Sequence, residues 1–347
     1  MSLVDSLMQP LRQEYSGQLD KFEMRQSRYA GYDLFQKQTN DASGILTPDV
    51  RSAVKKSFGN SVVIPVLNAD SVTIGNVRSC TIADSENTSK LITLTFVTYA
   101  FGFTMTPAQH YNNDVKYQAD FNQKLRKYLL QFASTLDTAC INKLSTDKNI
   151  YWPSAITNIY SQTGNALQVS QAQSPDFYNN LTSIMETLDF YGNYDIVAST
   201  SHNPLVRRLT NQGANNNTNQ VFQFNGYEWG YTNRLTNGAG IQSTVYVMPK
   251  GAVAMENRND PDAVMGSKVG DAKIWSEVEV PLVNLKMGSY YTKDCSDRSM
   301  VNTGTTGLTR SLVEGFEWST DVCYVTAYNS APSTKGSPII KAEISNT

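Results

Sequence analysis

The chain has 347 residues, of which 40% are hydrophobic and only 17% are charged, and its formal net charge is −2 at pH 7. This length allows one large domain or two smaller ones, and the near-neutral charge argues against a large basic surface for nucleic acid. Average globular proteins carry about 25% charged residues. A chain this poor in charge and rich in Asn, Thr, Ser and Tyr favours a surface that contacts protein neighbours.

The N-terminal sequence lacks the charged segment and apolar run of a signal peptide. No stretch approaches the ~20 apolar residues that a membrane span needs. We therefore expect a soluble protein that is made in a cytoplasm and has no membrane partner. The four cysteines show neither metal-binding nor disulfide-scaffold spacing, so we expect buried thiols at Cys80, Cys140, Cys295 and Cys323.

Residues 1–60 are predicted to form a peripheral arm. Apolar residues at helical spacing predict an amphipathic helix from Pro10 to Tyr29, and residues 36–44 form a polar stretch. A second, short helix is predicted from Thr47-Pro48, with Thr as N-cap and Pro in the first turn, to about Phe58.

Residues 61–105 change to a strand pattern with a period of two. Val72–Ile82 and Lys90–Phe103, separated by a polar turn at residues 83–89, are predicted to be the arms of a long β-hairpin. Both faces of this hairpin carry apolar side chains. Because an isolated two-stranded ribbon is only marginally stable in water, we expect it to lie against another surface.

A long helix is predicted next. Thr106-Pro107-Ala108-Gln109 has the sequence of a capping box with Pro at the first helical position. An apolar stripe continues to Leu144, which predicts a helix of roughly 55 Å at 1.5 Å per residue. The stripe has no regular heptad, which favours a helix lying along a sheet over a coiled coil.

The remaining chain alternates helices and strands and then returns to strands. Tyr151–Gln173 reads as a loop, and residues 211–219 read as an Asn-rich surface loop. Two helices are predicted, at Ser174–Leu188 and Asn203–Leu209. Strands are predicted at Tyr194–Ala198, Val221–Phe224, Tyr227–Tyr231, Thr244–Met248, Ala252–Glu256, Trp275–Met287, Phe316–Tyr324 and Ile339–Ile344.

The candidate residues for chemistry favour structural roles. The only two histidines, His110 and His202, are too few for a multi-histidine metal site, and no G-x-S-x-G nucleophile motif or phosphate-binding loop occurs. Gly238-Ala239-Gly240 reads as a turn. Asn257, Asn259, Asp260 and Asp262 lack the glycine of a calcium loop and also read as a turn.

The paired carboxylates Glu277 and Glu279 fit a solvated strand face better than acid–base chemistry. The four tryptophans are scattered, which favours a core or a subunit interface over a binding cleft. We therefore predict no catalytic, cofactor-binding or metal-binding residue, no cofactor, and a protein that is not an enzyme.

The order of elements resembles the major capsid proteins of tailed bacteriophages, which have the Hong Kong 97-type fold. The resemblance covers nearly the whole chain and rests on architecture, with local likeness at Val62–Pro65 leading into Asp70–Phe103, Thr106–Gln109, Tyr194–Ala198, Asn203–Val206 and Tyr246–Ala254. It implies an α+β fold with an N-terminal arm (1–60), an extended β-hairpin loop (61–105), a peripheral domain with a spine helix (106–173), an α/β axial domain (174–265) and return strands of the peripheral domain with the C-terminus (266–347).

The resemblance implies a subunit that assembles into pentamers and hexamers of an icosahedral capsid around a double-stranded DNA genome. The implied partners are copies of the chain itself, scaffold and portal proteins, possible cement proteins, and packaged DNA held without sequence specificity. The implied location is the virion capsid, assembled in the host bacterial cytoplasm. The alternatives are an encapsulin-like nanocompartment shell, another virion protein such as a tail protein, and an unrecognised hydrolase.

Overall fold

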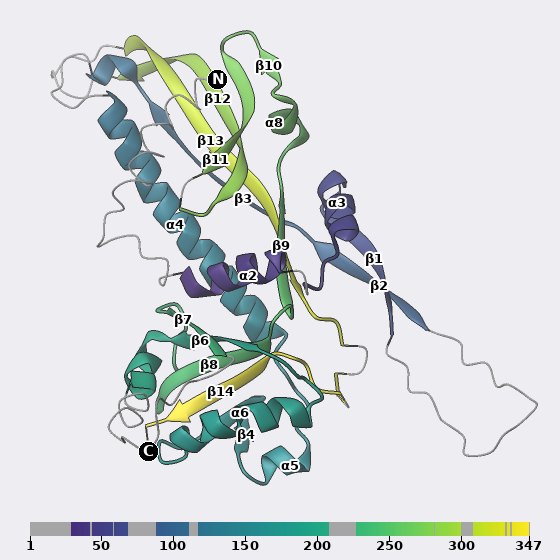
Figure 1. Ribbon diagram of the computed structural model, residues 1–347. Coiled ribbons are helices and arrows are strands. Elements are labelled where there is room, and N and C mark those ends of the chain that lie inside the picture. Colours follow the sequence, from purple (N-terminus) through teal and green to yellow (C-terminus); the bar gives the residue numbers. More distant parts are fainter. Residues whose placement is uncertain are drawn as a thin grey trace, which may run out of the picture. The chain divides into compact units, whose positions relative to one another are not determined.

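The computed structural model describes residues 29–41, 44–57, 59–68, 88–110, 117–207, 227–280, 282–299, 308–329, 332–333 and 335–346 (Figure 1). The chain divides into two compact units. Unit 1 comprises residues 1–33, 97–140 and 257–322, and unit 2 comprises residues 34–96, 141–256 and 323–347. Both units are discontinuous in sequence, so the chain passes between them several times.

Unit 1 is built on an antiparallel sheet. Its strands follow the order β10 (Lys268–Val269), β11 (Lys273–Val280), β12 (Leu285–Ser299), β13 (Leu308–Thr326) and β3 (Val97–Met105). The end of β9 (Val253–Arg258) lies beside β13, where the Thr320 hydroxyl donates a hydrogen bond to the carbonyl oxygen of Arg258.

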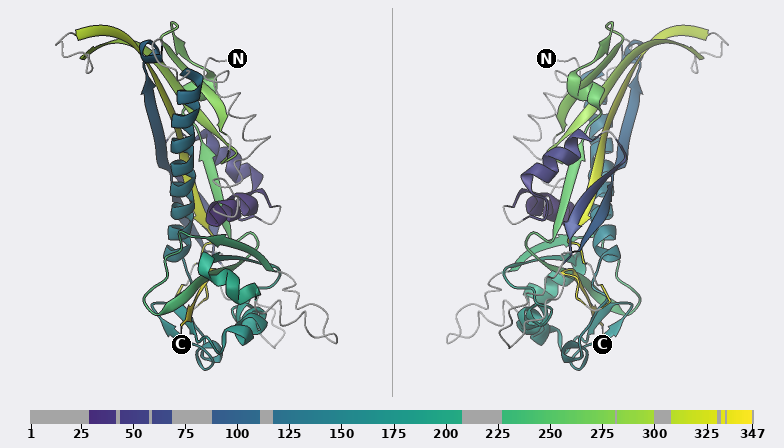
Figure 2. Two further views of the ribbon diagram at one scale, coloured as in Figure 1. Left: turned by 90° about the vertical axis from the view of Figure 1, so that its left-hand side faces the viewer. Right: turned by 90° about the vertical axis from the view of Figure 1, so that its right-hand side faces the viewer.

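Helix α4 (Tyr117–Thr146) has 30 residues, of which residues 117–140 belong to unit 1. It runs beside β3 in each view (Figures 1 and 2). Its buried side chains recur at helical spacing, at Phe121, Leu125, Leu129, Phe132, Leu136 and Cys140. Phe121 packs edge-on against Phe316 of β13 at 5.1 Å, and the stacked rings of Phe101 and Trp318 lie 5.5 Å apart.

The predicted long helix therefore exists but begins later than expected. Residues Pro107–His110 form a 3₁₀ helix instead of the first α-helical turn, and residues 111–116 lie outside the described part of the chain. The prediction of a helix lying along a sheet is confirmed, because the apolar stripe packs on β3 and β13.

Unit 2 contains a mixed sheet in the order β4 (Ser161–Thr163), β5 (Ala166–Val169), β14 (Ile340–Ser345), β8 (Ile241–Pro249), β6 (Tyr194–Ser199) and β7 (Tyr227–Thr232). Helix α6 (Ser174–Thr187) packs its apolar face on this sheet, and the short helix α5 (Ser154–Thr157) adds to the same core. Residues 203–207 are also helical. The predicted strands of this region are confirmed, apart from Val221–Phe224, which lies outside the described residues.

Two predictions in these regions are wrong. Tyr151–Gln173, predicted as loop, contains α5, β4 and β5. Trp275–Met287, predicted as one strand, is the antiparallel pair β11 and β12. The turn between them holds Leu282 and Asn284 at positive φ. This conformation is usually signalled in a sequence by glycine, and neither position is a glycine.

In the described part of the N-terminal region, α2 (Ala30–Asn40) overlaps the first five residues of the predicted polar stretch at 36–44, and α3 (Pro48–Lys56) follows at the predicted place. In unit 1 the start of α2 is capped by the buried carboxylate of Asp137, whose Oδ1 accepts hydrogen bonds from the backbone N–H groups of Gly31 (2.8 Å) and Tyr32 (3.0 Å). The predicted Pro10–Tyr29 helix and the Asn-rich loop lie outside the described residues.

The hairpin prediction needs one correction. Strand β1 (Ser61–Leu67) pairs with β2 (Ser89–Thr95) in an antiparallel ribbon of unit 2. The predicted second arm, Lys90–Phe103, is two strands that separate at Phe96, since β3 pairs with β13 instead. The predicted first arm, Val72–Ile82, lies outside the described residues.

Candidate assembly interface

The β1–β2 ribbon has two faces that differ in burial. Its strands are in register from Ser61 opposite Thr95 to Leu67 opposite Ser89, and side chains alternate between the faces. Ile64 lies opposite Ile92 on the face that we call the inner face of the ribbon. Pro65 lies opposite Leu91 on the other, the outer face.

The inner face packs on a small apolar cluster within unit 2. Leu94 is buried on this face, and Phe96 is buried directly after β2. They meet the buried Val54 of α3 and Cys323 of β13, with partly buried side chains around them at Val50, Val62, Ile64, Ile92 and Val325. Val50 and Val54 are four residues apart in sequence, so they lie on one side of α3. The helix therefore serves as the support of the ribbon.

The outer face is apolar and exposed. Val63, Leu67 and Leu91 are 52%, 70% and 68% exposed. The whole face carries no charged side chain, because its positions are Ser61, Val63, Pro65, Leu67, Ser89, Leu91, Thr93 and Thr95. Scattered exposed apolar residues are normal on a protein surface, but a contiguous uncharged face is typical of a protein contact.

Helix α3 is held on a neighbouring side by a buried carboxylate. Glu256 of β9 has only 2% of its side chain exposed and accepts two ion pairs, from Arg51 Nε at 2.6 Å and from Lys55 Nζ at 2.9 Å. Arg51 also donates from Nη1 to the carbonyl oxygen of Thr39 at 3.1 Å.

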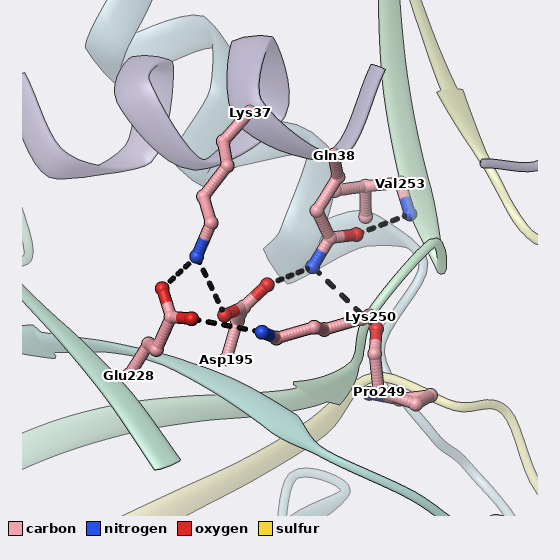
Figure 3. A network of polar contacts seen from close by, with 7 residues as sticks. All are labelled: Lys37, Gln38, Asp195, Glu228, Pro249, Lys250 and Val253. Carbon is pink, nitrogen blue, oxygen red and sulfur yellow. Dashed lines mark hydrogen bonds and ion pairs between the residues drawn. The ribbon is translucent and has the colours of Figure 1, made fainter. Parts of the chain in front are cut away.

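The unit 2 part of α2 is attached by polar contacts as well (Figure 3). Lys37 forms ion pairs with Asp195 of β6 and Glu228 of β7, and Lys250 pairs with Glu228 at 2.8 Å. The buried Gln38 donates to Asp195 at 2.7 Å and accepts from the backbone N–H of Val253 at 3.0 Å.

Next to this network, Thr39 Oγ1 accepts a hydrogen bond of 2.7 Å from the backbone N–H of Met255. Val253 and Met255 are two residues apart on β9, so their N–H groups point the same way. The side chains of Gln38 and Thr39 thus accept hydrogen bonds from two successive N–H groups on one edge of β9.

The structure places the two histidines in different surroundings. His202 is buried in unit 2, where Nε2 bonds to the Tyr178 hydroxyl, Nδ1 lies 2.9 Å from Ser243 Oγ, and the ring stacks on Trp229. Burial lowers the pKa of His202 to about 3. His110 has 12% of its side chain exposed and lies 3.5 Å from Asp120. His202 is therefore a buried, hydrogen-bonded side chain of the unit 2 core, and its structural role stays a prediction.

Two of the other residues singled out in the sequence meet on the surface, where Asn259 Nδ2 donates a hydrogen bond of 2.7 Å to Glu277 Oε1. Asp260 caps the short helix α8 (Pro261–Met265), accepting from the N–H of Asp262 at 2.9 Å, so this cluster starts a helix and is not a simple turn. Glu277 and Glu279 lie on the exposed face of β11, as predicted. Gly240 sits in a turn, also as predicted.

Cys140 and Cys323 are buried as predicted, whereas Cys295 is exposed, which corrects the prediction for that residue; Cys80 lies outside the described residues. Within the described part of the chain, no group of three or more His, Cys, Asp or Glu side chains is placed to hold a metal ion. Among the described helices, none is long and apolar enough to cross a membrane.

Comparison of the whole fold with solved structures is informative where sequence comparison is not. No family model matches the chain, and no curated protein matches it. A chain of the structure titled capsid of Ralstonia phage GP4 matches with a TM-score of 0.52 at 11% identity, over 94% of this chain and 93% of that one. A chain from Mycobacterium phage Bobi matches with a TM-score of 0.51 at 13% identity, over the full length of both chains.

The chain has the Hong Kong 97-type fold of tailed-phage major capsid proteins. At this level of identity the likeness concerns the fold and not individual residues. The resemblance predicted from the order of elements is confirmed at the level of the α+β capsid fold.

Sequence reasoning predicted strand at β2 but missed its pairing with β1 and the contacts that hold the ribbon. Glu256 ends a predicted strand with nothing to mark it as an anchor, and its cationic partners lie about two hundred positions away, as the separation of 205 between Arg51 and Glu256 shows. The one local signal was the pair Arg51 and Lys55, which are four residues apart and so lie on one side of α3.

Proposed function

We propose that the chain is the structural subunit of a tailed-phage capsid and has no enzymatic role. The observation that carries the proposal is the capsid fold, which matches two phage structures over 94% and 100% of the chain. The ribbon supports it, because an apolar outer face without charges is stable in water mainly when a neighbour covers it.

The proposal includes assembly into pentamers and hexamers that close into an icosahedral shell around double-stranded DNA. A contact in which the ribbon of one copy lies on a different surface of the next copy is heterologous, and such contacts close into rings when the rotation allows. Burying each of the three outer side chains contributes about 1 kcal/mol, which is weak alone but is repeated at every contact of a shell.

The finer parts of the proposal follow the predicted division of the chain. We propose an N-terminal arm at 1–60, an extended loop at 61–105, peripheral segments at 106–173 and 266–347, and an axial domain at 174–265. The near-zero net charge of the chain supports a shell that encloses DNA without binding it tightly or with sequence specificity. Scaffold, portal and cement proteins are the proposed partners, in a virion assembled in the bacterial cytoplasm.

The test is assembly of the purified chain, examined by size-exclusion chromatography and electron microscopy, alone and with its virion neighbours. The decisive variant replaces Val63, Leu67 and Leu91 with Ser. Because these side chains are exposed, each substitution should change the stability of the folded chain by at most about 0.5 kcal/mol, or about 1.5 kcal/mol for the three, while shells, tubes or rings disappear.

A matched control replaces three exposed apolar residues elsewhere in unit 2, at Ile150, Ile159 and Tyr191. This control should assemble like the wild type if the outer face of the ribbon is the contact. Shells that form equally well with the Ser variant would remove the ribbon from the proposal. A wild-type chain that does not assemble but hydrolyses a substrate in a broad screen would overturn the capsid function itself.

A further inference from the structure

Helix α3 presents two different pairs of side chains on neighbouring sides. Val50 and Val54 meet the inner face of the ribbon. Arg51 and Lys55, each one position later, meet Glu256. Since residues one apart on a helix are rotated by about 100°, a single short helix connects the ribbon to one buried carboxylate.

The contacts on the two sides of α3 differ in kind. The ribbon side is apolar and tolerant of small shifts, because packing is non-directional. The Glu256 side is ionic and directional, with both carboxylate oxygens engaged by separate cations at 2.6 and 2.9 Å. A carboxylate with 2% exposure cannot be left without a partner at low cost. The ionic side therefore fixes where α3 lies, and the ribbon follows α3.

We propose that Glu256 is a positioning residue that sets the direction in which the ribbon presents its outer face. Arg51 and Lys55 clamp α3 onto this carboxylate, and α3 and the ribbon move as one body when the clamp is removed. This inference rests on the proposed capsid function, because the outer face that Glu256 orients is the proposed subunit contact.

The experiment compares Glu256→Gln with the wild-type chain by hydrogen–deuterium exchange. The amide keeps the shape of the side chain but removes its charge. Exchange at the amides of α3 and of the β1–β2 ladder should accelerate roughly ten- to hundredfold. This range follows from the cost of breaking a buried ion pair, which is smaller here because the two cations are partly exposed. Exchange in β6, β8 and β14 should keep its wild-type rate.

Two matched controls separate the clamp from charge loss in general. Glu186→Gln removes an exposed carboxylate of α6 in the same unit, and it should leave all rates unchanged. Lys55→Gln should accelerate exchange in α3 and the ribbon, whereas Lys56→Gln, at the exposed next position of the same helix, should not. The lysine pair keeps the inference testable even where Glu256→Gln does not fold.

Equal exchange in Glu256→Gln and Glu186→Gln, or in the two lysine variants, would overturn the inference. Acceleration spread evenly over the whole of unit 2 would also overturn it, because that outcome indicates a general structural role. Electron microscopy then separates the two proposals. Regular wild-type shells with unchanged ribbon exchange in Glu256→Gln reject only the clamp, whereas accelerated ribbon exchange in a chain that never assembles rejects only the capsid function.

Discussion

Gln38 and Asp195 are joined by a buried hydrogen bond of 2.7 Å although they are 157 residues apart in sequence. The other end of the same amide accepts the N–H of Val253. One side chain therefore partners both a buried carboxylate of β6 and the edge of β9 (Figure 3). This amide ties the C-terminal part of α2 to two strands of unit 2.

Replacing Gln38 with Ala should lower the free energy of unfolding by about 2–4 kcal/mol. The substitution leaves a buried carboxylate and a buried N–H group each without one partner, and unpaired buried groups of this kind carry such costs. Chemical denaturation followed by circular dichroism measures the change. Gln162→Ala, at an exposed position of β4 in the same unit, should stay within about 0.5 kcal/mol of the wild type, and an equal loss in both variants would contradict the assignment.

The network around Gln38 shows what a single sequence can and cannot predict. Alternation of Ile92 and Leu94 with threonines identified a strand, and the apolar stripe from Phe121 to Cys140 identified the helix. These signals are local, because they depend on the period of one element. The partners of Gln38, in contrast, are set by topology, and nothing near residue 38 specifies residue 195 or residue 253.

The same reason explains the errors in strand pairing. Lys90–Phe103 reads as one continuous strand, yet it divides at Phe96 because β2 and β3 have different partners, at β1 and at β13. The pairing of Val97 with Val322 joins residues that lie far apart in sequence. The choice of strand partner depends on packing across the whole of unit 1. The sequence does not show it, because the propensity for strand is equal on both sides of Phe96.

The close packing around Gly102 of β3 allows a steric test of the pairing between β3 and β13. A Cβ atom at this position would lie 2.7 Å from the carbonyl oxygen of Phe316 and 3.3 Å from Cα of Glu317, both backbone atoms of β13. Because backbone atoms in the middle of a sheet cannot move aside easily, Gly102→Ala should cost about 1–3 kcal/mol, as overpacking does. Thermal or denaturant unfolding measures this loss.

Gly238→Ala is the matched control, since its nearest atom would be a side-chain carbon of Ile241 at an ordinary 3.6 Å. We expect that variant to unfold close to the wild type. A Gly102→Ala chain as stable as Gly238→Ala would mean that β3 and β13 are not in the register described.

His202 predicts a loss of stability in acid. Burial holds its pKa at about 3, below the ordinary value of 6.5, so the unfolded chain binds a proton between these values that the folded chain does not. The stabilising contribution is complete above pH 6.5 and is lost as pH falls towards 3, with a slope of up to about 1.4 kcal/mol per pH unit. Unfolding curves at successive pH values should show that His202→Gln loses this contribution relative to the wild type, whereas His110→Gln follows the wild-type curve.

Asp33 predicts the opposite sign in the same range of pH. Burial, together with the charge of Asp137, raises its pKa from 3.8 to about 7, so the folded chain holds a proton that the unfolded chain has released. Its contribution favours folding at low pH and is lost as pH rises from about 4 through 7. Between pH 4 and 6.5 one proton taken up on unfolding at His202 is therefore offset by one released at Asp33.

This cancellation gives a sharper measurement than either variant alone. Asp33→Asn should uncover the His202 slope, so its stability falls more steeply than that of the wild type from pH 6.5 to pH 4. His202→Gln should uncover the Asp33 slope, so its stability falls as pH rises across the same range. Parallel curves for both variants would refute the two assignments together, because opposite single-proton slopes cannot produce them.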